Sequence, residues 1–378
     1  MNLKYNSPVV LKERIDDSYN FKPLPDPSGA YPYRLNIAQI LGNKTQDIQD
    51  QMAFHMVGDT GSARHSDFQA LVASTMAEQL NAKDGTPPSF LYHLGDIVYN
   101  HGEAHEYPSQ FLEPYTCYGA PIFAIPGNHD GDINPDTSIP YESLDAFVDV
   151  FCDSYSRPVG FGGSITRKSM VQPNVYWTLE TPLARFIGLY ANVTKHGTIT
   201  DVQREWFIAE LAYAKEMRDE QALIVCIHHA PYSADTNHGS SLSMITELES
   251  AFVIAGVKPD AVFSGHVHNY QRFEKKYADG TATPYIVAGA GGYADLHTIA
   301  KTDDPTVMPL ETDDNDVRLQ AYCDNCYGFL KVEIEKTPTG LKLTGEYYSL
   351  SSSHGKVETT LYDRFETPLK HATSMAID

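Results

Sequence analysis

The sequence predicts an α/β fold, and three observations support this prediction. Short apolar runs of strand length recur along the chain, and segments with helical periodicity or helix-capping residues lie between them. Strands that alternate with helices in this way are typical of α/β folds. Blocks of polar, ligand-type residues also come directly after apolar runs, and the sites of α/β proteins lie at the carboxyl ends of their strands.

The expected elements follow in chain order. Residues 1–50 carry prolines at positions 8, 23, 25, 27 and 32 without clear periodicity, so we expect an N-terminal arm that packs on a single catalytic domain at 51–378. The expected strands are 53–57, 90–94, 121–125, 186–190, 223–227, 261–263 and 285–287. The expected helices are 66–80 with Ser66 as N-cap, 200–217 with a capping-box spacing from Thr200 to Gln203, and 240–255.

The C-terminal part of the chain changes in character. A stretch from 292 to about 319 is rich in Asp, Thr and Pro, and we expect a surface excursion there. Two alternating segments, 328–334 and 341–348, flank the sequence Thr337-Pro-Thr-Gly340. Such segments around a Pro/Gly turn predict a C-terminal β-hairpin in the same domain.

Composition narrows the class of protein. With 378 residues, of which 42% are hydrophobic, the chain can bury the core of one large domain. A formal net charge of −21 argues against a surface that binds nucleic acid or an acidic membrane. No apolar segment has signal-peptide or membrane-span length. We therefore expect a cytoplasmic protein, or a periplasmic or secreted one if a leader has been removed.

The five cysteines are sparse and odd in number, which is not typical of a disulfide framework. Cys323 and Cys326 have the spacing of half a zinc knuckle or of a redox motif, yet no second pair completes a four-ligand site. We expect a structural or incidental role for this pair, with a local disulfide as the alternative.

Five blocks carry the chemistry of the chain. Their ligand-type residues are Asp59, then Asp96 with Tyr99, Asn128, the pair His228 and His229, and His266 with His268. Together they offer two carboxylates, a phenol, an amide oxygen and three or four imidazoles, which is more than one metal ion needs. A carboxylate can bridge two cations about 3.5–4 Å apart, and imidazoles favour transition metals over magnesium or calcium. The blocks therefore predict a two-metal centre.

These blocks resemble the calcineurin-like metallophosphoesterases and, within them, the purple acid phosphatases. Tyr99 and Gly61 are the discriminating marks, because many other relatives have His in place of Gly61 and lack the tyrosine. The resemblance covers residues 53 to about 290. It implies a four-layer α/β/β/α sandwich of two mixed β-sheets flanked by helices.

The resemblance also implies two metal ions and their ligands. One ion, typically ferric iron, would be held by Asp59, Asp96, Tyr99 and His268. The other, usually iron, zinc or manganese, would be held by Asp96, Asn128, His228 and His266. His228 and His229 are adjacent, and alignment of Pro231-Tyr232-Ser233 with the family pattern favours His228, with His229 as the alternative.

Three further residues are candidates for catalysis. His129 lies beside the ligand Asn128 and is expected to donate a proton or stabilise the transition-state oxygens, with Asp130 placed to orient or charge it. The alternative for His129 is a structural residue that supports the ligands. His238 is similar to a histidine that contacts substrate in purple acid phosphatases, and a plain surface histidine is the alternative. Arg64 and His65 are lesser candidates for contact with the phosphate. His55 and His93 are expected to be packed strand residues, and His101 and His105 to lie on the surface.

The function expected from these residues is hydrolysis of small phosphate monoesters, of the acid phosphatase type, by attack of metal-bound hydroxide. A phosphodiesterase of the same superfamily is the first alternative, and the missing histidine at Gly61 counts against it. A catalytically inactive binding protein is a remote alternative, because a site that no longer catalyses a reaction usually loses some of its metal-ligating residues. The sequence leaves the oligomeric state open.

Overall fold

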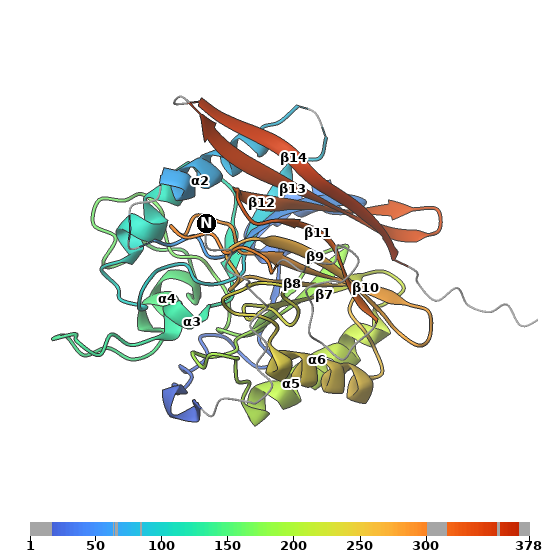
Figure 1. The fold of residues 1–378 in the computed structure, drawn as a ribbon, viewed down its shortest axis with the longest axis horizontal. Helices are drawn as coiled ribbons and strands as arrows, with labels where there is room; N and C mark the ends of the chain where they lie inside the picture. The colour runs from blue at the N-terminus through green and yellow to red at the C-terminus, as the bar shows by residue number, and fades with distance from the viewer. Residues whose placement is uncertain are drawn as a thin grey trace, which may run out of the picture.

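The structure is a computed structural model that describes residues 17–62, 64, 67–83, 85–300, 316–353 and 356–369. Two mixed β-sheets lie face to face and helices flank them, which confirms the predicted sandwich (Figure 1). The strands are β1 (Arg34–Asn36), β2 (Gln51–Val57), β3 (Pro88–His93), β4 (Ile122–Ala124), β5 (Trp177–Glu180), β6 (Ala184–Leu189), β7 (Ala222–Ile227), β8 (Ala261–Ser264), β9 (Tyr270–Lys276), β10 (Ala282–Ala288), β11 (Val317–Cys323), β12 (Tyr327–Thr337), β13 (Gly340–Ser353) and β14 (Lys356–Leu369). The α-helices are α1 (Ala38–Leu41), α2 (Asp67–Gln79), α3 (Asn128–Gly131), α4 (Asp145–Phe151), α5 (Asp201–Glu216) and α6 (Leu242–Ala255). The short 3-10 or π segments are η1 (Ser18–Asn20), η2 (Gly42–Ile48), η3 (Pro108–Leu112) and η4 (Pro114–Cys117).

Each sheet combines a run of parallel strands with antiparallel pairs. The larger sheet has the strand order β1-β5-β6-β7-β8-β10-β9-β11, and the smaller has β14-β13-β12-β2-β3-β4. Strands β6, β7, β8 and β10 are parallel, as are β2, β3 and β4. Parallel strands end at the same edge of a sheet, so the loops that follow them are neighbours.

Aromatic side chains fill the space between the sheets. Phe54 of β2 stacks on Phe90 of β3 with 5.2 Å between ring centroids, and Phe186 of β6 meets both rings edge-on. All three side chains are fully buried. Strands that are covered on both faces have continuous apolar runs, which explains why the central strands are easy to recognise in the sequence.

Helices cover the sheets on the outside. The α5–α6 pair packs below the larger sheet in the view of Figure 1, and α2 lies by the smaller one. Helix α5 begins as predicted, since the hydroxyl of Thr200 accepts a hydrogen bond from the backbone N–H of Gln203 at 3.2 Å. Helix α6 is capped by Ser241. Ser66, the expected cap of α2, lies outside the described residues.

The C-terminal hairpin is confirmed, because β12 and β13 pair up to the register of Thr337 with Gly340. The prediction of a surface excursion from 292 to about 319 is wrong from Val317 onward, because β11 begins there and pairs with β9. Residues 301–315 of this stretch lie outside the described part of the chain. Part of the expected arm forms β1, which pairs with β5 in the larger sheet. The division at residue 50 stays a prediction.

Two further observations concern disulfide bonds and membrane-spanning helices. All five cysteines are free, so Cys323 and Cys326 form no disulfide in this structure. Within the described ranges, no helix combines the length and the apolar character that crossing a membrane requires.

Candidate metal centre

The ligand-type residues come together at the carboxyl ends of five strands, β2, β3, β4, β7 and β8. Asp59, Asp96 and His266 each follow such an end with left-handed backbone, at φ values of 57°, 53° and 68°. Non-glycine residues in this region carry strain of about 1–3 kcal/mol, and such strain clusters at functional sites. The turns are tight, because a side chain on Gly127 would overlap the carboxylate of Asp96.

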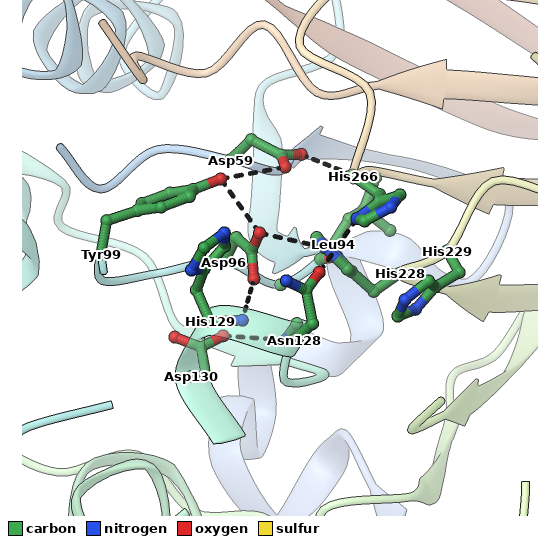
Figure 2. A network of polar contacts seen from close by, with 12 residues as sticks. Asp59, Leu94, Asp96, Tyr99, Asn128, His129, Asp130, His228, His229 and His266 are labelled. Atoms are coloured by element: carbon green, nitrogen blue, oxygen red, sulfur yellow. Dashed lines mark hydrogen bonds and ion pairs between the residues drawn. The ribbon is translucent and has the colours of Figure 1, made fainter. Parts of the chain in front are cut away.

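One group of donor atoms surrounds the Tyr99 hydroxyl (Figure 2). Tyr99 Oη lies 3.2 Å from Asp59 Oδ1, 3.0 Å from Asp96 Oδ2 and 3.2 Å from His268 Nε2. Metal–ligand bonds to O and N are about 2.0–2.2 Å long, so donor atoms around one ion lie about 3 Å apart. The spacing of these four donors fits one bound ion.

A second group surrounds the imidazole of His228. His228 Nε2 lies 3.2 Å from Asp96 Oδ2, and His266 Nδ1 lies 2.9 Å from Asn128 Oδ1. Ligand atoms of Asp96, His228 and His266 all fall within 4.8 Å of one another. The buried Nε2 of His228 makes no hydrogen bond. Because Asp96 belongs to both groups, its carboxylate links them.

Backbone carbonyls orient two of the imidazoles. Nδ1 of His228 lies 2.8 Å from the carbonyl oxygen of Leu94, and Nδ1 of His268 lies 3.0 Å from that of Asp295. A carbonyl can only accept, so each Nδ1 carries a proton, and each Nε2 is left to face the cluster. His229 instead pairs its Nε2 with the carbonyl of Thr194 at 3.0 Å. This geometry favours His228 over His229 as the ligand.

The buried charges suit cation binding. Burial raises the pKa of Asp59 well above its ordinary value. Burial also raises the pKa of Asp96, but His228 and His129 outweigh that effect and lower it overall. Burial lowers the pKa of His266 and of His268 far enough that both rings are neutral at pH 7. Neutral imidazoles beside an ionised carboxylate are the forms that ligate metals.

His129 and Asp130 are neighbours in the sequence but are held by different partners. The Nδ1 of His129 donates to the carbonyl of Asn100 at 2.6 Å, and its ring lies 4.4 Å from that of Tyr99. The carboxylate of Asp130 accepts backbone N–H bonds from Ile97 at 3.0 Å and from Gly127 at 2.8 Å. The expectation that Asp130 orients or charges His129 is therefore corrected, because its oxygens fix the loops after β3 and β4.

His238 lies beside the cluster. Its ring centroid is 4.2 Å from that of His266 and 6.2 Å from that of His268, and the side chain is partly buried. The alternative of a plain surface histidine does not describe this position. Burial lowers the pKa of His238 to about 4.

Two aromatic residues near the centre were not predicted. Tyr293 packs on Tyr99 with 4.2 Å between centroids, and His297 stacks on His268 at 4.2 Å. Both belong to the segment after β10, where the sequence offers only Gly291-Gly292 as a signal of a tight turn.

The remaining candidates lie away from the cluster or at its rim. His55 and His93 are buried in the smaller sheet, as predicted. His101 pairs with Asp132, and the mostly exposed His105 pairs with Glu106. Arg64 forms an exposed ion pair with Asp295 at 2.9 Å, and His65 lies outside the described residues.

The fold and the cluster define a class, namely a two-sheet α/β sandwich with candidate metal-ligand side chains at the ends of its parallel strands. The family model for calcineurin-like phosphoesterases matches residues 52–270, and the chain belongs to this family.

The curated proteins to which the chain is similar include purple acid phosphatases. The chain is 26% identical over 308 residues to purple acid phosphatase 23 of Arabidopsis thaliana, covering 77% of this chain and 59% of that protein. It is 27% identical over 267 residues to Fe(3+)-Zn(2+) purple acid phosphatase 12 of the same plant, covering 63% and 50%. The chain thus spans only about half to three-fifths of these curated relatives.

A solved structure shares the fold. GAP50, described as the anchor in the inner membrane complex of Plasmodium, superposes with a TM-score of 0.56 at 15% identity, covering 85% of this chain and 90% of that one.

Proposed function

We propose that this protein is a dinuclear-metal-dependent hydrolase of small phosphate monoesters, of the acid phosphatase type. The observation that carries the proposal is the position of Asp96 between two groups of donors. Its Oδ2 atom is 3.0 Å from Tyr99 Oη and 3.2 Å from His228 Nε2. A carboxylate in such a position can bridge two cations, as two-metal hydrolases require.

The donor chemistry fits iron in one position and iron, zinc or manganese in the other. Asp59, Asp96, Tyr99 and His268 would hold the first ion, and Asp96, Asn128, His228 and His266 the second. A phenolate favours a trivalent ion, and the imidazoles favour transition metals. The name of the Fe(3+)-Zn(2+) relative supports this pairing. When bound, the two ions supply Lewis acidity that activates water and neutralises phosphate charge.

His129 and His238 are the residues that would act on the substrate. The Nδ1 of His129 is fixed by the Asn100 carbonyl at 2.6 Å, which leaves its other ring nitrogen for the leaving oxygen. In its doubly protonated form His129 carries a second proton on that nitrogen, and we assign it as proton donor to the leaving oxygen. We assign His238 to a hydrogen bond with a phosphate oxygen, because its ring packs at 4.2 Å from the ligand His266.

The proposed substrate class rests on the net charge of the chain and on the proteins to which the chain is similar. The net charge of −21 disfavours polymeric nucleic acid as substrate, and several relatives are named purple acid phosphatases. We therefore favour a small phosphate monoester. A phosphodiesterase of the same family is the alternative that the experiment must separate.

The experiment is hydrolysis of an aryl phosphate monoester beside the matching diester, across pH, after reconstitution with ferric iron plus zinc or with manganese. The proposal expects faster cleavage of the monoester with an acidic optimum. His105→Ala serves as the control, because this exposed histidine is outside the cluster. Preferential diester cleavage would establish the phosphodiesterase alternative, and absence of turnover with every metal would indicate a binding protein.

A further inference from the structure

Two loops join beside the metal centre. The loop after β7 and the loop after β10 are connected by backbone hydrogen bonds from Ala300 N–H to the carbonyl of Ala234 at 2.8 Å and from Thr236 N–H to that of Thr298 at 3.2 Å. Asp235 and Ile299 form an isolated antiparallel bridge between them. These two loops carry His238 and His297, respectively, so the position of one histidine is tied to that of the other.

Asp235 is the buried acid at this junction. Its side chain is 0% exposed, and its Oδ2 atom accepts the backbone N–H of His238 at 2.9 Å. The same oxygen lies 3.3 Å from Nδ1 of His297. One carboxylate oxygen therefore contacts both loops.

The imidazole rings pack in a continuous row beside this carboxylate. His238 lies 4.2 Å from His266 and 5.0 Å from His297, centroid to centroid, and His297 stacks on His268 at 4.2 Å. The backbone N–H of His297 also donates to the carbonyl of His268 at 3.0 Å. His297 is thus anchored to one expected metal ligand while its ring packs against His238.

We propose that Asp235 and His297 are a positioning pair that holds the ring of His238 against the metal centre, ready to contact an oxygen of the phosphate ester. This inference rests on the proposed function for the identity of the substrate, and on geometry for the role of the pair. A histidine on a loop otherwise samples several rotamers, and ordering it on substrate binding weakens affinity. Packing between His266 and His297 orders the ring before substrate arrives.

The kinetic test compares His297→Ala, His238→Ala and the double variant, with His105→Ala as control. Loss of a residue that supports another at a metal site costs about 10- to 100-fold in activity or affinity, so His297→Ala should raise KM for the monoester about 10-fold. Its kcat should change far less. The double variant should match His238→Ala alone, because coupled residues are not additive. Independent, multiplicative losses would overturn the proposal.

A second readout does not depend on turnover. In a crystal structure of metal-loaded His297→Ala, the His238 ring should leave its position beside His266, while His266, His268 and the metal content stay as in the wild type. An unmoved His238 ring would overturn the positioning role, and so would loss of metal. If the wild type hydrolyses no phosphate ester, the proposed function fails, and the ring position still decides the role of the pair.

Discussion

Two buried histidines, His55 in the smaller sheet and His228 at the strand ends, show how one residue type serves two purposes. Both are almost inaccessible to solvent, at 0% and 1% exposed. His55 pairs Nδ1 with the hydroxyl of Tyr118 and Nε2 with Oε1 of Gln79, each at 3.0 Å. His228 pairs only Nδ1 with a carbonyl, and its Nε2 faces Asp96 without a hydrogen bond. A fully paired ring stabilises the fold, whereas a half-paired ring beside a carboxylate is suited to bind a cation.

The same contrast separates two buried aspartates. Asp130 accepts backbone N–H bonds from Ile97, Val98 and Gly127. Asp96 accepts one backbone bond from His129, and its other oxygen faces Tyr99 and His228. Asp130 is therefore expected to hold loops together, and Asp96 to hold metal.

The strongest test of this contrast is Asp96→Ala. Removing the shared carboxylate should lower kcat/KM for a phosphate monoester by about a thousandfold or more, since the loss of even one stabilising donor costs about 10²–10³. His55→Leu should keep the turnover of each folded molecule near that of the wild type. Steady-state kinetics on the two variants, with the folded fraction measured by circular dichroism, checks both expectations. A strong loss of turnover in folded His55→Leu would contradict the comparison.

Removing the metal ions should have the second-largest effect, a loss of stability. A ligand present at a thousand times its Kd stabilises the folded state by about 4 kcal/mol, so a chelator should lower the free energy of unfolding by a comparable amount. Urea unfolding with and without chelator measures this difference. The same difference should persist in His55→Leu and should largely vanish in Asp96→Ala.

Tyr99→Phe should have an intermediate effect. It removes one oxygen donor and leaves the ring that packs on His129 and Tyr293, so the fold should be kept. The visible absorption of an iron–phenolate pair should disappear, and kcat should fall on the order of 100-fold, the upper end for weakened metal sites. Absorption spectra of the iron-loaded wild type and variant provide the check. A retained visible band in the variant would remove Tyr99 from the ligands.

His55→Leu should have the smallest effect, and that effect should depend on pH. Leaving Tyr118 and Gln79 without their partner should cost about 1–3 kcal/mol near pH 7. Burial lowers the pKa of His55 from 6.5 to about 3, so below pH 6.5 the unfolded chain takes up a proton that the folded chain refuses. Stability from this neutral histidine is thus lost as pH falls, by about 1.4 kcal/mol per unit.

The substitution should therefore cost about 1.4 kcal/mol less at about pH 5.5 than near pH 7. Urea unfolding of the wild type and His55→Leu at the two pH values gives the comparison. An equal cost at both would mean that His55 is not held neutral.

The sequence predicted the central strands and the cluster because both depend on local pattern. Apolar runs such as 53–57 are buried on both faces, and the ligand residues directly follow their ends. Strand β14 was missed because residues 357–362 are exposed in succession, so no alternation reveals it. Asp130 was misread because its sequence neighbour is His129, whereas the short helix α3 turns its carboxylate toward the loops. The contact of Asp235 with His297 spans 62 positions and leaves no local pattern.

The most direct test of the account is the metal content of each chain, measured by elemental analysis after reconstitution with ferric iron plus zinc. The account predicts two ions per chain in the wild type, about one in Asn128→Ala, and fewer than one in Asp96→Ala, because Asp96 belongs to both donor groups. A wild type that holds a single ion, or an Asp96→Ala variant that keeps two, would contradict the shared carboxylate on which the account depends.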